Sequence, residues 1–235
     1  MSKTATMTKV QSKVSTKILQ LPREREKLYK LIDTVVSTLE KGGIACLPTE
    51  TCYIVAGDAT REDVVSRIIE MKGPKEREGF GIVVADVRMA KEYAQLDEVA
   101  EHLCHSFMPG PLTLIAKGKT GLAKNLLMTP TAGVSFKISG NAVLREISNA
   151  LGKPITSTSA NYADQPTISK SAELKTAFEG KADLIIDAGD LPRVQQSTIV
   201  DLRTSPPSVK REGTIPLKDI LKEIEAFKNP KEDES

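Results

Sequence analysis

Hydroxyl side chains are concentrated in one short stretch of the chain, residues 154–167, with the sequence Pro-Ile-Thr-Ser-Thr-Ser-Ala-Asn-Tyr-Ala-Asp-Gln-Pro-Thr. An apolar lead-in followed by the four hydroxyl residues 156–159 is typical of a strand that runs out into a polar turn at Asn161. Hydroxyls and an amide at a strand end suit a polar pocket better than a core, because a buried polar group needs a hydrogen-bond partner. Since ligands of open α/β sheets bind at strand ends, the stretch predicts one wall of a pocket for a polar, anionic small molecule.

Two further polar segments, residues 48–53 and the charged loop 72–81, also follow predicted elements. Together these clusters supply hydroxyls, cations and loop amides but few candidate bases. The chain contains neither Gly-x-x-x-x-Gly-Lys-Ser/Thr nor Gly-x-Gly-x-x-Gly, the glycine-rich phosphate loops, and no Gly-x-Ser-x-Gly nucleophile turn. This pattern favours a reaction that depends on positioning and charge stabilisation rather than on a nucleophilic side chain.

The elements that must position these clusters alternate between helix and strand. Apolar positions three and four apart predict a helix over residues 28–39, ended by Gly42-Gly43. Asn141 is expected to cap a helix that Gly152 ends, and Thr60 to cap another. The other expected elements are strands over residues 44–47, 82–85, 112–116, 134–138, 184–187 and 198–202, a helix near 170–178 and a C-terminal helix from about Leu217. The alternation predicts an α/β fold, a single-domain twisted open sheet of mostly parallel or mixed strands flanked by helices, with a concave ligand cleft.

The composition is that of an ordinary globular protein. The net charge of +2 neither demands nor excludes a nucleic acid partner, and no apolar run approaches the ~20 residues of a membrane span. Three cysteines, Cys46, Cys52 and Cys104, are too few for a disulfide framework and favour a reduced, cytoplasmic compartment. His102, Cys104 and His105 would point to different faces of a helix, so no metal site is expected there.

Several short motifs occur along the chain in a fixed order: Pro48-Thr49-Glu50-Thr51-Cys52-Tyr53, Lys72-Gly73, Met108-Pro109-Gly110-Pro111-Leu112-Thr113, Ser157-Thr158-Ser159-Ala160-Asn161, Gln196-Ser197-Thr198-Ile199-Val200-Asp201 and Arg211-Glu212-Gly213. This order resembles that of the YrdC domain family, the threonylcarbamoyl-adenylate synthases of tRNA modification. The resemblance implies a YrdC-like domain over residues 25–215. Residues 1–24 would then be a flexible N-terminal extension, with a transit peptide as the alternative, and residues 216–235 a C-terminal helix and polar tail.

The resemblance implies a synthase that condenses L-threonine, bicarbonate and ATP into threonylcarbamoyl-AMP and pyrophosphate. The product would pass to a tRNA threonylcarbamoyl-transfer complex that modifies adenosine 37 of tRNA. A site that holds a triphosphate, a carboxylate and bicarbonate together needs several cations, and Mg²⁺ is expected with the ATP. A cationic cleft would also suit tRNA or double-stranded RNA as a partner, whereas no membrane partner is expected.

The motifs also imply roles for individual residues. Lys72 resembles the catalytic cation of the ATP and carbonate region. Residues implied on the threonine side are Thr51, Ser157, Ser197 and Lys137, and those implied on the nucleotide side are Lys72, Lys75, Arg77, Ser159, Asn161, Thr167 and Arg211. Asn161 and Ser159 have a competing interpretation as residues that build the turn, because Ser and Asn bond readily to nearby backbone.

Four places depart from the family pattern. Pro74 stands where the family carries an arginine, for which Lys75 or Arg77 would substitute, and Val83 stands in place of a histidine. Lys137 replaces another arginine, and the run 53–56 lacks two glycines. These changes support an alternative, a diverged family member that binds nucleotide or RNA without full synthesis. A third reading, carbamoyl transfer in metalloenzyme maturation, would require zinc-finger and acyl-phosphate modules for which the chain has no room.

Overall fold

The computed structural model describes residues 14–73, 80–127, 132–162, 164–192 and 194–229. The strands in this part are β1 (Lys17–Gln20), β2 (Ala45–Pro48), β3 (Tyr53–Ala56), β4 (Gly81–Val83), β5 (Ala94–Gln95), β6 (Leu112–Gly118), β7 (Gly133–Lys137), β8 (Ile155–Ser159), β9 (Leu184–Asp187), β10 (Thr198–Asp201) and β11 (Ser208–Arg211). The helices are α1 (Arg25–Glu40), α2 (Glu62–Lys72), α3 (Val87–Tyr93), α4 (Glu98–Phe107), α5 (Ala142–Leu151), α6 (Ser171–Phe178) and α7 (Leu217–Lys228), with a short 3₁₀ turn at Lys124–Leu126.

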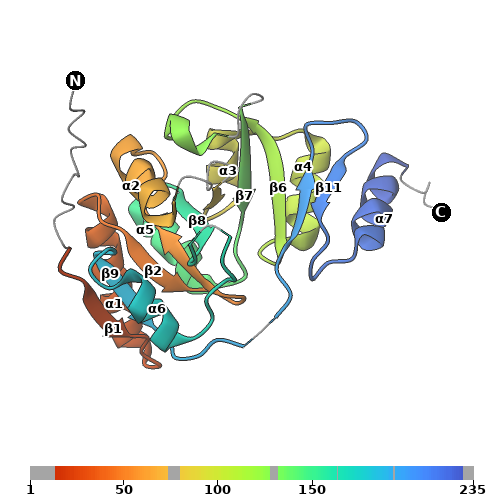
Figure 1. Ribbon diagram of the computed structural model, residues 1–235. Helices are drawn as coiled ribbons and strands as arrows, with labels where there is room; N and C mark the ends of the chain where they lie inside the picture. The colour runs from red at the N-terminus through yellow and green to blue at the C-terminus, as the bar shows by residue number, and fades with distance from the viewer. Residues whose placement is uncertain (1–13, 74–79, 128–131, 163, 193, 230–235) are drawn as a thin grey trace, which may run out of the picture.

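These strands form one open mixed sheet with helices on both faces (Figure 1). The order is β1-β9-β2-β3-β8-β4-β7-β6-β10-β11, and β5 pairs with β6 beside this path. Parallel pairs such as β4 with β7 occur next to antiparallel pairs such as β6 with β7. The predicted α/β fold with an open mixed sheet is therefore confirmed.

Strand β8 joins the two halves of the sheet. It pairs antiparallel with β3 through Ile54 and Ser159, and antiparallel with β4 through Gly81 and Ser157. The first half of the sheet (β1, β9, β2, β3) meets the second half (β4, β7, β6, β10, β11) at this strand. The hydroxyl stretch thus lies at the centre of the sheet rather than at an edge.

Each face of the sheet carries its own hydrophobic core. One core packs α1 and α5 against the sheet, and the other packs α2, α4, α6 and α7 against the opposite face. The apolar positions that predict the first helix supply its buried side, namely Leu31, Ile32, Val35, Val36 and Leu39. Burial of each such side chain contributes about 1.5–3 kcal/mol, which explains why the helical spacing was a reliable signal.

Of the two predicted helix caps, the cap of α5 is confirmed and the cap of α2 is not. Asn141 accepts a hydrogen bond from the Val143 amide at 2.9 Å, and Gly152 ends α5 in the left-handed region at φ +66°, as predicted. The Thr60 cap is wrong. Asp58, which is buried, accepts hydrogen bonds from the Thr60 amide and hydroxyl at 2.8 and 2.6 Å, and α2 begins two residues later.

Three boundaries differ from the expectations. Residues 17–20, expected in a flexible extension, form β1 and pair in parallel with β9. Lys72, expected in a loop, is the last residue of α2, while residues 74–79 lie outside the described part. Strand β3 is an element that the sequence analysis does not predict, because the run 53–56 resembles a site motif. None of the helices in the described ranges is both long and apolar enough to cross a lipid bilayer.

Candidate functional site

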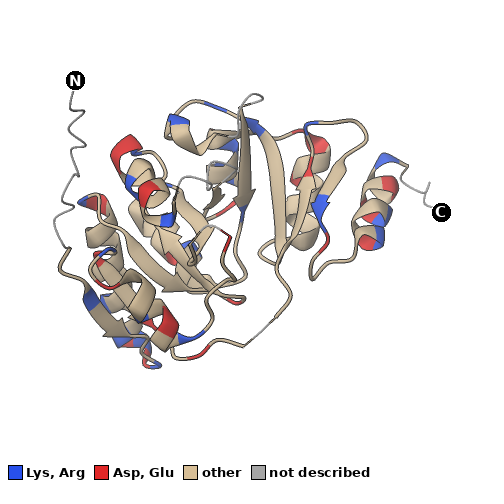
Figure 2. Cartoon of the chain, viewed as in Figure 1, with Lys and Arg blue, Asp and Glu red and all other residues tan. Residues whose placement is uncertain are grey.

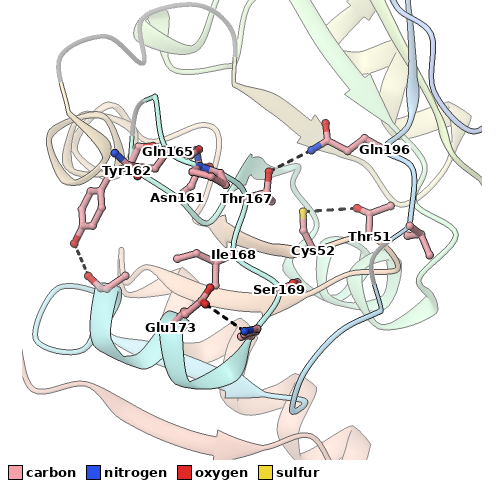
Figure 3. Close-up of a pocket in the computed structure, with 14 residues that line it drawn as sticks. Thr51, Cys52, Asn161, Tyr162, Gln165, Thr167, Ile168, Ser169, Glu173 and Gln196 are labelled. Carbon is pink, nitrogen blue, oxygen red and sulfur yellow. Dashed lines mark hydrogen bonds and ion pairs between the residues drawn. The ribbon is translucent and has the colours of Figure 1, made fainter.

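A cleft with two lobes that share lining residues lies beside β8, the strand at the centre of the sheet. The larger lobe has a volume of about 830 Å³ and lies between the loop after β8, the start of α6 and the segment before β10. The smaller lobe has a volume of about 220 Å³ and lies over the ends of β4, β7, β8 and β11. Thr51, Cys52 and Gln196 line both lobes, so they mark the boundary. Figure 3 shows the larger lobe.

Most of the residues predicted for the site lie around this cleft. The larger lobe is lined by Thr51, Asn161 and Thr167, and the smaller by Thr51, Lys137, Ser157, Ser159, Ser197 and Arg211. Lys72 lies behind the strand that forms the wall. Lys75 and Arg77 fall outside the described residues, so their predicted contacts stay predictions.

Thr51 is presented by a turn whose hydrogen bonds converge on Thr49. The Thr49 hydroxyl accepts from the amides of Thr51 and Cys52 at 3.0 and 3.1 Å and donates to the Cys52 carbonyl at 2.7 Å. Thr49 is buried, so these bonds hold the turn in one conformation. The turn between β2 and β3 therefore places Thr51 at the boundary of the two lobes.

The Lys72 side chain is buried against β8. Its ammonium donates to the Thr158 hydroxyl at 2.5 Å and to the Ser159 backbone carbonyl at 2.8 Å, and the residue is only 1% exposed. The predicted cation thus lies at the hydroxyl wall, where its hydrogen bonds fix the end of β8. Its contact with ATP stays a prediction.

Ser159 and Asn161 build the turn after β8, as their competing interpretation anticipated. Asn161 accepts from the Ser159 hydroxyl at 2.5 Å and donates to the carbonyls of Tyr162 and Gln165 at 3.0 and 2.8 Å. Both polar atoms of the Asn161 side chain are engaged by its own loop. A role in nucleotide binding stays a prediction for both residues.

Arg211 supplies a cation at the rim of the smaller lobe. Its guanidinium donates to the Ser197 carbonyl at 3.0 Å, to the Ser197 hydroxyl at 3.3 Å and to the Gln196 amide oxygen. Although much of the residue is exposed, enclosure of its guanidinium end lowers its pKa, an effect that nearby Cys52 opposes. An arginine stays charged despite such a shift, so Arg211 remains available to an anion.

Cys52 also lines the smaller lobe, near Lys137. Burial raises the pKa of the Cys52 thiol, and the hydrogen bond from Thr51 and the charge of Lys137 oppose the increase without cancelling it. The thiolate is the reactive form of cysteine. A thiol kept protonated by burial is therefore a lining group rather than a nucleophile, in line with the reaction type that the sequence favours.

Two residues of the site were not singled out from the sequence. In the sequence Gln196 is only one member of a motif, whereas in the structure it donates from Nε2 to Thr167 Oγ1 at 3.2 Å across the larger lobe (Figure 3). Tyr162 lines the same lobe, donates to the Ala177 carbonyl at 2.7 Å and stacks on Phe178 with ring centroids 6.0 Å apart. An aromatic residue directly after the hydroxyl motif, in a chain with only 4% aromatic residues, was the available signal.

Two departures from the family pattern concern residues that lie in the cores. Val83 is fully buried with Leu144 and Ile155 in the core beneath α1 and α5. Ile54 and Ala56, which stand where the family carries glycines, are buried in the same core, and Ile54 also lines the smaller lobe. Substitutions at Val83 and Ala56 therefore alter core packing, whereas Ile54 contributes to both the core and the cleft.

The histidines and Cys104 have structural partners instead of forming a cluster. His102 Nε2 lies 2.8 Å from Glu223 Oε1, and its ring stacks on Phe227 of α7. Cys104 is buried in the core. Among the described residues there is no group of three or more side chains of metal-ligating type.

Comparisons with known proteins were made on the sequence and on the fold. The family model Sua5_yciO_yrdC, described as telomere recombination, matches residues 37–213. A threonylcarbamoyl-AMP synthase of Pyrococcus abyssi is 30% identical over 86% of this chain, which spans only 59% of that relative. The uncharacterized protein YciO of Escherichia coli is 28% identical over 82% of this chain and 93% of its own length.

Solved structures give the same picture. The structure of P. abyssi Sua5 complexed with L-threonine has a TM-score of 0.80 at 28% identity, covering 89% of this chain and 60% of Sua5. E. coli YciO has a TM-score of 0.77 at 26% identity, covering 88% of this chain and 99% of YciO. In length the chain therefore resembles YciO, and it spans about 60% of the P. abyssi protein.

Proposed function

The chain belongs to the Sua5/YciO/YrdC family, and on this premise we propose that it is an L-threonylcarbamoyladenylate synthase. It would condense L-threonine, bicarbonate and ATP into threonylcarbamoyl-AMP and pyrophosphate. The observation that supports this most directly is the two-lobed cleft, in which a lobe of about 830 Å³ shares lining residues with a smaller lobe that carries two cations, Lys137 and Arg211.

The two lobes suit different parts of the substrate set. A volume of about 830 Å³ lies in the range typical of sites for nucleotide-sized ligands. We assign the nucleotide to the larger lobe, beside Thr167 and Asn161. The smaller lobe, with Lys137, Arg211 and the Ser197 hydroxyl, would hold the threonine carboxylate and bicarbonate.

The products define the bonds that change. The threonine amine attacks bicarbonate, and loss of water leaves a carbamate. A carbamate oxygen then attacks the α-phosphorus of ATP, and pyrophosphate leaves. Each step needs reactants held in line and charge stabilised, which cations and hydroxyls supply without a covalent enzyme intermediate.

Mg²⁺ would enter with the triphosphate. Protein sites often hold this ion through one or two carboxylates and the substrate phosphates. Among the described residues, Glu173 is the acidic side chain that lines the larger lobe. The Glu50 carboxylate, next to Thr51 in sequence, accepts from the Ser139 hydroxyl at 3.1 Å. The residues present fit a metal carried by ATP better than a resident metal site, and the bound ion would neutralise phosphate charge.

The acceptors of the product are part of the same proposal. A tRNA, or a transfer complex that carries it, would take the threonylcarbamoyl group. In the described elements, acidic and basic residues are interspersed along helices such as α2 and α7 (Figure 2). Any RNA contact would therefore be local to the cleft, and its affinity would fall with added salt.

Pyrophosphate release tests the reaction. The full chain is incubated with ATP, Mg²⁺, L-threonine and bicarbonate, and each substrate is omitted in turn. Release that requires all three substrates supports the synthase. Binding of ATP without threonine-dependent release would instead support the diverged nucleotide- or RNA-binding protein.

A further inference from the structure

Thr51, Cys52 and Gln196, the three residues at the boundary of the lobes, differ in the hydrogen-bond partners of their side chains. The Thr51 hydroxyl lies 3.7 Å from the Cys52 thiol, so these two interact within their own turn. Gln196 instead bonds to residues outside its own segment in two directions. It is the boundary residue whose side chain connects the two sides of the cleft.

The orientation of the Gln196 amide follows from its partners. A guanidinium has only donors, so the amide oxygen must face Arg211, from which it accepts. The amide nitrogen then faces the larger lobe and donates to Thr167 Oγ1 at 3.2 Å (Figure 3). One side chain thus links a cation of the smaller lobe to a hydroxyl of the larger lobe.

Arg211 is held by neutral acceptors. These are the carbonyl and hydroxyl of Ser197 and the amide oxygen of Gln196. None of them carries a charge, so the guanidinium keeps its positive charge for an anion in the cleft. A carboxylate at position 196 would supply a similar acceptor but would cancel that charge.

Thr167 belongs to a loop that is anchored apart from Gln196. The Ile168 carbonyl accepts from the Tyr53 amide at 3.2 Å, and the Ser169 carbonyl accepts from the Leu191 amide at 2.8 Å. The loop therefore stays in place when the Gln196 bond changes. A ligand that engages the Thr167 hydroxyl alters what this hydroxyl accepts from Gln196, and so alters how Gln196 holds Arg211.

We propose that Gln196 is a positioning residue that couples the two lobes. Occupancy of the larger lobe by nucleotide sets, through Thr167 and Gln196, the placement of Arg211 for the anion in the smaller lobe. This inference rests on the proposed function, because it takes ATP as the ligand of one lobe and threonine as the ligand of the other. It makes binding of the amino acid depend on the nucleotide.

Calorimetry measures the coupling directly. The Kd of L-threonine is determined with and without saturating α,β-methylene-ATP and Mg²⁺. For the wild type we expect the analogue to tighten threonine binding about tenfold, within the usual range of coupling between sites. In Gln196→Met this ratio should fall below about twofold when both Kd values of threonine are measured at zero and at saturating analogue.

Two further variants sharpen the result. Gln196→Glu keeps an acceptor for Arg211 but loses the donor to Thr167, so it should lose the coupling and also bind threonine more weakly without nucleotide. Gln195→Met is the matched control, because Gln195 is exposed and its backbone carbonyl, not its side chain, accepts from Thr214 Oγ1 at 2.9 Å. It should keep the wild-type ratio.

Thermal unfolding verifies that each variant is folded, and Gln196→Glu carries the test if Gln196→Met does not fold. A wild-type ratio in either Gln196 variant would overturn the coupling and leave the synthase proposal standing. A wild-type protein that binds neither the analogue nor threonine would overturn both.

Discussion

The Lys72 ammonium lies 2.5 Å from the Thr158 hydroxyl, so the last residue of α2 is fastened to the strand at the centre of the sheet. The same ammonium donates to the Ser159 carbonyl at 2.8 Å. A buried lysine of this kind holds the wall of the cleft in place from behind, whatever it contributes to a bound phosphate.

Replacement of Lys72 by methionine tests whether this lysine contributes both to stability and to activity. Methionine keeps the length of the side chain but leaves the half-buried Ser159 carbonyl without this donor. We expect the free energy of unfolding in urea to fall by about 1–3 kcal/mol and substrate-dependent pyrophosphate release to be lost. The control is Lys30→Met, since Lys30 forms an exposed ion pair with Glu26 and should change stability by less than about 0.5 kcal/mol. Wild-type release in Lys72→Met would contradict the assignment of this lysine to the site.

Gly213 permits a close approach of two backbone segments. A Cβ at this position would lie 2.1 Å from the Gln196 carbonyl oxygen and 2.6 Å from the Ser197 carbonyl carbon. Gly213→Ala should therefore push Arg211 and Gln196 apart and lower stability by about 1–3 kcal/mol in thermal or urea unfolding. Gly140→Ala is the control, because its Cβ would meet its nearest neighbour at 3.8 Å. Equal stability of the two variants would contradict this prediction, because it would mean that residues 196–197 move away from the added Cβ at no cost in free energy.

Asp187 makes stability depend on pH in the acid range. Burial raises the pKa of this carboxyl, but hydrogen bonds, first among them that from Lys175 at 2.5 Å, outweigh burial and hold the pKa well below its usual value. A lowered folded-state pKa stabilises the protein above the unfolded-state pKa of about 3.9, and this contribution is lost as the pH falls further. The stability difference between wild type and Asp187→Asn should thus be largest near pH 6 and shrink below about pH 4. Urea unfolding over pH 3–7 measures it, and a difference independent of pH would refute the interpretation.

The three cysteines should differ in their rates of alkylation. Burial raises the pKa of all three thiols, that of Cys104 to about 12. Cys52 is 8% exposed and lines the cleft, whereas Cys46 is fully buried. With N-ethylmaleimide at neutral pH we expect slow modification of the native protein, with Cys52 first and with protection by ATP and threonine. Peptide mass spectrometry follows the order, and urea-unfolded protein, in which all three should react alike, is the control. Earlier modification of Cys46 would be inconsistent with the structure.

Much of the fold could be predicted from the sequence because local chemistry determined it. The apolar spacing of α1 and the cap at Asn141 are local features, and both are confirmed. The gathering of Ser157, Ser197 and Arg211 around one lobe followed from ordered motifs. The charged run 72–81, marked by Gly and Pro, predicts a loop for Lys72, and only the tertiary partners on β8 make its burial favourable. Likewise, the bond between Gln196 and Thr167 joins residues 29 positions apart, and no local pattern records it.

The position of β8 has a consequence for synthesis of the chain on the ribosome. Residues 155–159 complete the pairing of both β3 and β4, and β9, at residues 184–187, must insert between β1 and β2. A nascent chain that ends before these strands carries two unjoined sheet fragments with open edges. Such distant pairings slow folding and expose strand edges to aggregation. These edges therefore stay open until β9, at about four-fifths of the chain length, has been synthesised.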